Sequence, residues 1–352
     1  MAKTARAVIA HGQDFDIREY PVPDPEPNTI LLRQELAGIC GTDLHNWQNG
    51  IRGEMLLGHE NVGIIESIGK GVTTDYLDNP ISQGDRIVFA PGVKGGYGAY
   101  GFRQDADNPP HFSGGFADYI YLSIPNTCFL KTDAPPEISV LTEPFAVGVH
   151  AVMRGGVQIG DTVVIQGSGA IGLVTLVGAK ISGAAKLIMV GGPAGRLELA
   201  ERMGADVTIN IEDVTSAEAR TELIKEHTPQ KEGADVVFEC AGFLSATPEG
   251  LGYVKFGGTF VEVGHFVDMG SIQLNPNQLL MRKNLRLEAV WGFQYEHFIR
   301  GLPILEKAEF PFADMISHVL PLSRVGEGFE ALNGSYQLDD QTTIKIAIKS
   351  QS

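Results

Sequence analysis

The stretch TVVIQGSGAIGLVTLVGAK, residues 162–180, joins an apolar run to a helical pattern through the sequence G-x-G-x-x-G. The first glycine permits a tight turn, the second lets the backbone approach a pyrophosphate, and the third allows the helix to pack closely. Unpaired N–H groups at the helix start add a partial positive charge. The alternative is an ordinary strand-to-helix turn, but the position of the motif between strand and helix predicts a dinucleotide site. The expected contacts are Gly167, Gly169, Ala170, Ile171 and Gly172.

Apolar strands alternate with amphipathic helices after this motif, which indicates a parallel sheet covered on both faces. The expected elements are the strands KLIMV (186–190), DVVFE (235–239), GTFVEV (258–263) and LRLEAV (285–290), and the helix GRLELAERMG (195–204). The alternation fades after about residue 295, where a helix and terminal strands such as TTIKIAIK (342–349) follow. This tail could pack back on the first part of the chain.

Residues 4–150 are instead β-rich, with short apolar runs such as TILLRQEL (29–36) and FADYIYL (116–122) between Gly, Pro, Asp and Asn. Helical periodicity begins in EISVLTEPFAVGVHAVMRGG (137–156). A chain of 352 residues exceeds what one core usually supports. We therefore predict an α/β protein with a β-rich domain, 1–152 completed by 296–352, and a doubly wound parallel-sheet domain, 153–295.

The choice of nucleotide depends on the end of the second strand of the sheet. An acidic residue roughly 20 positions beyond the glycines would bind the ribose 2′-hydroxyl of NAD. Gly191 stands at that position, and Arg196 follows five residues later. Because no carboxylate would repel a 2′-phosphate there, the sequence predicts that NADP is accepted, although Arg196 could equally be a solvated surface residue.

The overall composition excludes several classes of protein. The net charge of −16 would repel a phosphate backbone, so nucleic acid is not an expected partner. The longest apolar region, 162–179, is interrupted by a glutamine and by glycines and a serine, which argues against a membrane span. Only three cysteines occur, Cys40, Cys128 and Cys240, so no disulfide framework is expected. We expect a cytoplasmic protein.

A second group of residues has the chemistry of a metal site. The stretch GICGTDLHNW (38–47) supplies Cys40, MLLGHENVG supplies His59, and LTEPFAVGVHA supplies Glu143. A catalytic zinc takes about three protein ligands from Cys, His and carboxylate, with one position open. A lone Cys is more often a small buried residue, a lone His a structural one, and Glu143 could complement a helix dipole. The residue types alone do not decide between a metal site and these structural roles.

The order of the motifs resembles one family. GICGTDLH, GHENVG, GDRIVF, GGFADY, EPFAVGVHA and GSGAIG follow the order and approximate spacing found in zinc-dependent medium-chain alcohol dehydrogenases, in the branch with sorbitol and threonine dehydrogenases. The similarity covers nearly the whole chain. It implies a GroES-like catalytic domain, a Rossmann domain, and hydride transfer between a secondary alcohol or polyol, or the matching ketone, and NAD or NADP. It also implies a homodimer or homotetramer.

The resemblance further implies a role for each residue of the metal group. Cys40, His59 and Glu143 fall on the positions that bind the catalytic zinc. Glu60 falls on a glutamate beside the metal that can replace a ligand or water during turnover. Cys40 is then a ligand and not a nucleophile.

Three further residues would orient the site and move its proton. By the same resemblance, Asp43 would orient the His59 ligand, Thr42 would take the proton of the substrate, and His45 would pass it outward. The nicotinamide would meet the metal in a cleft between the domains, near Gly264 at the end of a strand.

The sequence departs from the family after GDRIVF. Most zinc-bearing relatives carry a structural zinc on four cysteines in that region, and this chain has none there, so we expect the structural zinc to be absent. The aromatic residues of the lobe would pack there or against a neighbouring subunit; they are Tyr97, Tyr100, Phe102 and Phe112.

Two other classes of function remain as alternatives. A zinc-free quinone or alkene reductase of the same superfamily would keep the glycine turn but usually lose the ligand set, which is retained here. A non-catalytic nucleotide-binding protein would have no use for Thr42 and His45.

Overall fold

The computed structural model describes residues 3–92, 100–102 and 111–350. The chain forms two compact units, Met1–Glu143 with Phe298–Ser352, and Pro144–His297. Both observed boundaries lie inside helices, α3 (Thr142–Gly155) and α8 (Tyr295–Lys307). The boundaries expected from the sequence, after residues 152 and 295, fall within the same two helices.

Six parallel strands form the sheet of the second unit, in the order β11-β10-β9-β12-β13-β14. The order reverses beside β9, because β10 pairs with one edge of β9 and β12 with the other. This doubly wound arrangement confirms the predicted class, and sheets of this kind bind ligands beyond the carboxyl ends of the strands where the strand order reverses. The strands are β9 (Thr162–Gln166), β10 (Lys186–Gly191), β11 (Val207–Asn210), β12 (Ala234–Glu239), β13 (Val254–Glu262) and β14 (Arg286–Ala289).

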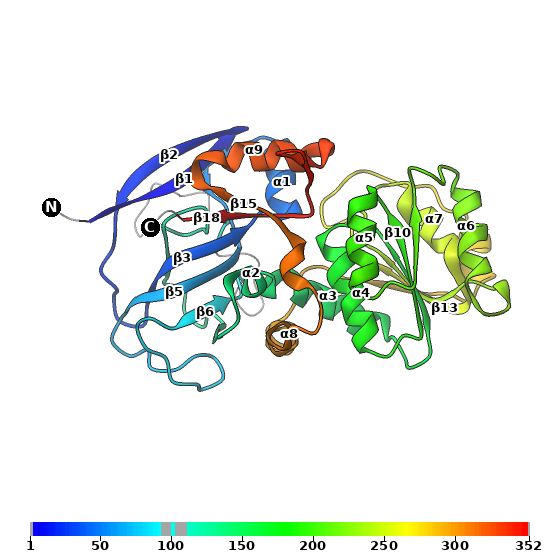
Figure 1. The fold of residues 1–352 in the computed structure, drawn as a ribbon, viewed down its shortest axis with the longest axis horizontal. Helices are drawn as coiled ribbons and strands as arrows, with labels where there is room; N and C mark the ends of the chain where they lie inside the picture. The colour runs from blue at the N-terminus through cyan, green and yellow to red at the C-terminus, as the bar shows by residue number, and fades with distance from the viewer. Residues whose placement is uncertain (1–2, 93–99, 103–110, 351–352) are drawn as a thin grey trace. The chain divides into compact units, whose positions relative to one another are not determined.

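Helices cover both faces of this sheet. In Figure 1, α4 and α5 lie on one side of the strands and α6 and α7 on the other. The sequence pattern did not single out β11, α6 or α7, because β11 is only half buried and α6 is mostly polar. The helices are α4 (Ala170–Ile181), α5 (Ala194–Arg202), α6 (Ala217–Glu226) and α7 (Ala246–Tyr253). Buried strand residues such as Val164, Ile188, Val237 and Phe260 form the core between the sheet and one helix layer.

The first unit contains a larger mixed sheet and a smaller antiparallel one. Seven strands follow the order β15-β18-β3-β5-β6-β8, with β7 also paired to β3, and three more follow the order β2-β1-β4. The C-terminal strand β18 pairs antiparallel with β3, so the tail does return to the first part of the chain. The strands are β1 (Thr4–Gly12), β2 (Asp14–Pro21), β3 (Ile30–Gly38), β4 (Ile51–Leu56), β5 (Glu60–Ile68), β6 (Arg86–Phe89), β7 (Tyr119–Leu122), β8 (Phe129–Lys131), β15 (Ile316–Pro321) and β18 (Lys345–Lys349).

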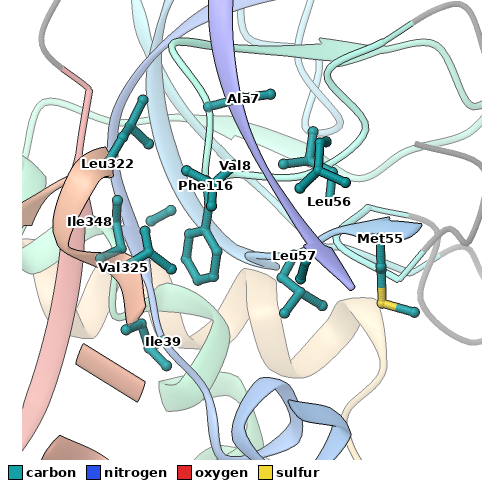
Figure 2. Packing of buried hydrophobic residues seen from close by; sticks show 14 of the residues in the cluster. Ala7, Val8, Ile39, Met55, Leu56, Leu57, Phe116, Leu322, Val325 and Ile348 are labelled. Carbon is teal, nitrogen blue, oxygen red and sulfur yellow. The ribbon is translucent and has the colours of Figure 1, made fainter. Parts of the chain in front are cut away.

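The largest core of this unit joins its N-terminal and C-terminal segments. Figure 2 shows residues from β1, β4, β18 and the connections around them packed about the ring of Phe116. Each large apolar side chain buried in this way contributes about 1.5–3 kcal/mol. The labelled residues are Ala7, Val8, Ile39, Met55, Leu56, Leu57, Phe116, Leu322, Val325 and Ile348.

The helical stretch expected over 137–156 is two helices, α2 (Pro136–Ser139) and α3. Pro144 explains the break, since inside one continuous helix it would remove a backbone hydrogen bond. In the observed arrangement Pro144 lies in the first turn of α3, where proline is tolerated. The remaining elements of the chain are α1 (Gly41–Gln48), α9 (Val325–Glu330), the short helical turns Pro229–Lys231, Asn277–Met281, Phe312–Met315, Leu322–Arg324 and Ala331–Ser335, and the short strands β16 (Gln337–Leu338) and β17 (Gln341–Thr342).

The aromatic residues expected in the lobe after GDRIVF have different positions. Tyr100 and Phe112 are buried, and the Tyr100 ring lies 5.2 Å from that of Phe89. Phe102 lies against His59, and Tyr97 falls outside the described residues. Within the described part of the chain, no helix combines the length and apolarity needed to span a bilayer.

Candidate active site and metal centre

Cys40 directly precedes helix α1 in extended backbone conformation, with φ −96° and ψ 157°. The side chain of Asp43, in the first turn, accepts a hydrogen bond from the backbone N–H of Cys40 at 3.0 Å. The other carboxylate oxygen of Asp43 lies 3.1 Å from Nδ1 of His59. One fully buried aspartate therefore contacts both the backbone of Cys40 and the ring of His59.

His59 is held from two sides. Asp43 engages Nδ1, which leaves Nε2 as the ring atom that can bind a cation. The ring of Phe102 packs at a centroid distance of 4.4 Å. Cys40, His59 and Glu60 bring their potential ligand atoms to within 4.8 Å of one another. The region therefore has the geometry of a metal centre.

Glu60 opens strand β5, and its carboxylate is buried against the ammonium group of Lys345 in β18. Both strands pair with β3, where Gly38 is in register with Glu60 and with Ala347. A Cβ atom on Gly38 would lie 2.0 Å from Oε2 of Glu60. The glycine that begins GICGTD is therefore needed to make room for the buried ion pair.

Glu143 lies in the first turn of α3 within electrostatic reach of this group. Burial raises the pKa of Glu143, and this effect outweighs the positive charge on His59, which lowers it. Burial lowers the pKa of His59, but the charges of Asp43 and Cys40 raise it well above its usual value overall. The buried acids here outnumber the bases that can balance them, which a divalent cation would correct.

The donor set at this site fits zinc. A thiolate, an imidazole and a carboxylate are ligands that catalytic zinc takes in proteins, with a fourth position open. Glu60 belongs to the group whose ligand atoms lie within 4.8 Å of one another, whereas Glu143 is not in that group. Cys40, His59 and a carboxylate would hold the metal, and the choice between Glu143 and Glu60 as the third ligand stays a prediction.

Thr42 and His45 lie on α1, both half-buried. The hydroxyl of Thr42 accepts a weak hydrogen bond from the thiol of Cys40 at 3.8 Å, so Thr42 lies directly beside the expected ligand. Burial lowers the pKa of His45, which keeps the ring neutral and able to accept a proton at neutral pH. The relay from Thr42 to His45 itself stays a prediction.

The glycine turn of the second unit has the shape that a dinucleotide requires. Gly167 has φ 106°, and its N–H donates to the carbonyl of Val190 at 2.7 Å. A Cβ on Gly172 would fall 1.7 Å from the carbonyl oxygen of Gly167, so only glycine allows this packing. At Gly169, directly before α4, a Cβ would meet no atom within 4 Å. The space beside Gly169 is therefore open to a ligand.

Two alanine variants of this turn should separate binding from folding. Gly169→Ala should weaken NADP binding by about tenfold or more, since its methyl group would enter the open space, and should leave the melting temperature unchanged. Gly172→Ala should instead lower stability by about 1–3 kcal/mol through the clash with Gly167. Fluorescence titration with NADPH and thermal melts check both; equal nucleotide affinity in Gly169→Ala and the unaltered protein would contradict the assignment.

The region expected to bind the ribose contains two residues, Ser168 and Glu212, that sequence spacing did not indicate. The hydroxyl of Ser168 both accepts the N–H of Gly192 at 3.0 Å and donates to its carbonyl at 2.9 Å, next to Gly191. The Cγ atom of Glu212 lies 3.7 Å from where a Cβ on Gly192 would stand. Arg196 is buried in α5 and is not a solvated surface residue. A carboxylate therefore lies near this edge, although none stands at Gly191.

Three further residues, His150, Trp47 and Cys128, have side-chain types that are common in active sites but make structural contacts here. Nδ1 of His150 lies 2.8 Å from the carbonyl oxygen of Gly292, and its ring stacks on that of His297. Trp47 is buried and donates from Nε1 to the carbonyl of Gln13. Cys128 is fully buried, and burial raises the pKa of its thiol to about 12.

Lys345 is the residue beside the metal group that sequence reasoning missed. Only 4% of its side chain is exposed, although it stands in an apolar strand. The signal was present, because a lysine in KIAIK, within a strand expected to be buried, needs a carboxylate partner. The sequence could not identify Glu60, 285 residues away, as that partner.

One unit gathers a thiolate, an imidazole and a carboxylate, and the other is a doubly wound domain with an open glycine turn. Together in one chain, these two features define a zinc-dependent oxidoreductase that uses a nicotinamide nucleotide. The chain belongs to the zinc-dependent medium-chain alcohol dehydrogenase family, in the branch that contains sorbitol dehydrogenases. It is an enzyme that acts on alcohols or polyols, with zinc and NAD(P) as cofactors.

This assignment rests on comparisons over nearly the full length. Residues 26–134 match the alcohol dehydrogenase GroES-like domain, and residues 170–307 match the zinc-binding dehydrogenase domain. Sorbitol dehydrogenase of Gallus gallus is 31% identical, covering 94% of each chain, and 5-exo-hydroxycamphor dehydrogenase of Pseudomonas putida is 30% identical, covering 92% of this chain and 94% of that one. An alcohol dehydrogenase structure from Thermotoga maritima has a TM-score of 0.90 and 26% identity, covering 99% of this chain and 100% of that one. These relatives lend no support to a zinc-free reductase or a non-catalytic protein.

Proposed function

We propose that this chain transfers a hydride between a secondary alcohol or polyol, or the matching ketone, and NAD(P), with Cys40, His59 and Glu143 as the zinc ligands. The observation that carries this proposal is the double contact of Asp43, which joins the Cys40 backbone to the His59 ring. A panel of polyols, secondary alcohols and ketones, followed by nicotinamide absorbance with both cofactors, tests it. Turnover of none of these classes by the zinc-loaded protein would refute it.

The residues around the ligands would handle the substrate proton. Zinc bound here would lower the pKa of the substrate hydroxyl, and the nicotinamide would take the hydride. Thr42, beside Cys40, would accept the hydroxyl proton, and neutral His45 would carry it outward along α1. Lys345 would hold Glu60 beside the ligands, from where the carboxylate could replace a ligand or a water molecule.

NADP should be used at least as efficiently as NAD, because Gly191 offers no carboxylate to the ribose. Two variants should move the preference in opposite directions. Arg196→Ala should lower kcat/KM for NADP, and Glu212→Gln should raise it, since Glu212 lies near Gly192 and would repel a 2′-phosphate. Steady-state kinetics with both nucleotides checks this; a strong preference of the unaltered enzyme for NAD would refute it.

A homodimer through the edge strand β14 is the oligomer that we propose. β14 ends the six-stranded sheet, so one side of its backbone has no neighbour among the described strands. Met281, Leu287 and Trp291, in and around this strand, are 75%, 55% and 61% exposed. A second copy that pairs with this edge would cover apolar surface and satisfy backbone groups together.

Leu287→Lys should therefore shift the protein from dimer, or tetramer, toward monomer, because it places a charge in the middle of the edge. Light scattering after size exclusion measures the mass. Ile159→Lys is the matched control, since Ile159 is 90% exposed and lies elsewhere in the same unit. A monomeric unaltered protein, or an unchanged mass in Leu287→Lys, would contradict the proposed interface.

A cytoplasmic location is also proposed. Cys40, Cys128 and Cys240 are all free thiols in the structure, and the metal site depends on one of them. A reducing compartment keeps such thiols available.

A further inference from the structure

A second cluster of metal-binding residue types lies in the other unit, far from Cys40 in the sequence. Glu239, Glu262 and His265 bring their ligand atoms to within 4.8 Å of one another. Glu239 ends β12 and Glu262 ends β13, and the two residues are in register as neighbours in the parallel sheet. His265 follows three residues later, so the topology gathers all three at the carboxyl edge of the sheet.

Each carboxylate in this cluster is anchored through one of its oxygens. Oε1 of Glu239 accepts the backbone N–H groups of Ala241 and Gly242 at 2.7 and 2.8 Å. Oε2 of Glu262 accepts the hydroxyl of Thr247 at 3.0 Å. Oε2 of Glu239 and Oε1 of Glu262 are the oxygens nearest to the ring of His265, and Oε1 of Glu262 also accepts the backbone N–H of His265 at 3.4 Å. Outer hydrogen bonds of this kind orient carboxylate ligands in metal sites.

The inward atoms have spacings that suit a small cation. Nδ1 of His265 lies 3.0 Å from Oε1 of Glu262 and 3.5 Å from Oε2 of Glu239. Ligand bonds of about 2.0–2.2 Å place neighbouring ligand atoms roughly 3.0–3.5 Å apart. No rearrangement of the backbone is needed to reach this geometry.

Among the described residues, the ion-pair partner of both glutamates is His265. Glu239 is fully buried, and its Oε2 accepts no hydrogen bond from the described residues. Burial and the neighbouring Glu262 raise the pKa of Glu239, and no lysine or arginine of the described chain forms an ion pair with either glutamate. A fully buried carboxylate beside a second, partly buried one is stabilised by a shared proton or by a bound cation.

A cavity gives access to the cluster. Its volume is about 370 Å³, and Glu262 and His265 line it together with Asp268 and Trp291. Water molecules there could complete the coordination of a cation and also bond to Nε2 of His265, which has no hydrogen-bond partner in the described structure.

We propose that Glu239, Glu262 and His265 form a second divalent-cation site, distinct from the zinc site at Cys40. Two carboxylates neutralise a 2+ charge. Because these three residues include no thiolate, the site should prefer harder ions such as Mn²⁺, whereas the thiolate of Cys40 favours zinc. Cations of this class keep water ligands, for which the cavity has room.

Titration of the zinc-loaded enzyme with Mn²⁺, followed by the electron paramagnetic resonance of the free ion, tests the proposal. One Mn²⁺ should bind per chain while the zinc content stays constant. Glu262→Gln and His265→Asn should each abolish binding in the micromolar range. Thr247→Val, which removes only the anchor of Glu262, should weaken binding by about 10–100-fold.

The control is Asp268→Asn, because Asp268 is an exposed carboxylate that lines the same cavity outside the cluster. It should bind Mn²⁺ like the unaltered chain, and Cys40→Ala should do so as well. Thermal melts establish that each variant is folded. Failure of the unaltered protein to bind Mn²⁺ at millimolar concentration would overturn the proposal, and so would equal binding by the unaltered protein, Glu262→Gln and His265→Asn.

Discussion

Cys40→Ala is expected to lower kcat/KM by about 10⁴-fold or more and to remove tightly bound zinc. A metal lowers the pKa of a bound hydroxyl by several units, and this activation is lost with the ion. Cys40 supplies the only sulfur in the cluster with His59 and Glu60, so alanine removes the softest ligand. Metal analysis after dialysis and steady-state kinetics with the best alcohol of the panel measure both effects.

Nucleotide affinity should stay near normal in Cys40→Ala, because Cys40 and the glycine turn belong to different units. Cys128→Ala is the matched control: Cys128 is a free, fully buried thiol of the same unit as Cys40. It should keep its zinc and its activity at a modest cost in stability. If metal-free Cys40→Ala turned over substrate at the normal rate, the zinc mechanism would be wrong.

Local sequence was sufficient for the nucleotide turn. The role of Gly172 depends on its contact with Gly167 five residues earlier, and the turn lies between an apolar strand and a helix, both of which are visible as patterns. The strands β9, β10 and β12 are confirmed because their apolar runs are buried on both faces, and β13 and the largely exposed β14 are confirmed by their parallel pairing at the edge of the sheet. β11 was missed because it is short, Val207–Asn210, and only partly buried, so it shows no clear apolar run.

The metal group was only partly predictable. Resemblance to a family indicated Cys40, His59 and Glu143, with Glu60 beside the metal, and the helix start at Cys40 explains how Asp43 reaches His59. Which carboxylate lies nearest the thiolate depends on the register of β5 against β3, and that register brings Glu60 to the site. Long-range register cannot be read from spacing, because a shift by one residue sends the side chain to the other face.

The ion pair between Lys345 and Glu60 also depends on long-range strand pairing that the sequence does not show. Its loss is the second large effect that we expect. Lys345→Met should lower the free energy of unfolding of the zinc-loaded protein by about 3–5 kcal/mol. The side chains of Lys345 and Glu60 are 4% and 0% exposed, so removal of the lysine leaves a buried carboxylate without its counter-charge. Burial lowers the pKa of Lys345, but the charges of Glu60 and Cys40 raise it overall, which keeps the ammonium group charged in the folded state.

Lys349→Met is the matched control for this loss, because Lys349 ends the same strand with its side chain exposed. It should change stability by no more than about 0.5 kcal/mol. The double variant Lys345→Met with Glu60→Gln should regain part of the loss, since it leaves no unpaired buried charge. Urea unfolding followed by circular dichroism measures all four proteins. A loss in Lys345→Met no larger than that in Lys349→Met would show that the buried ion pair does not hold β18 and β5 together.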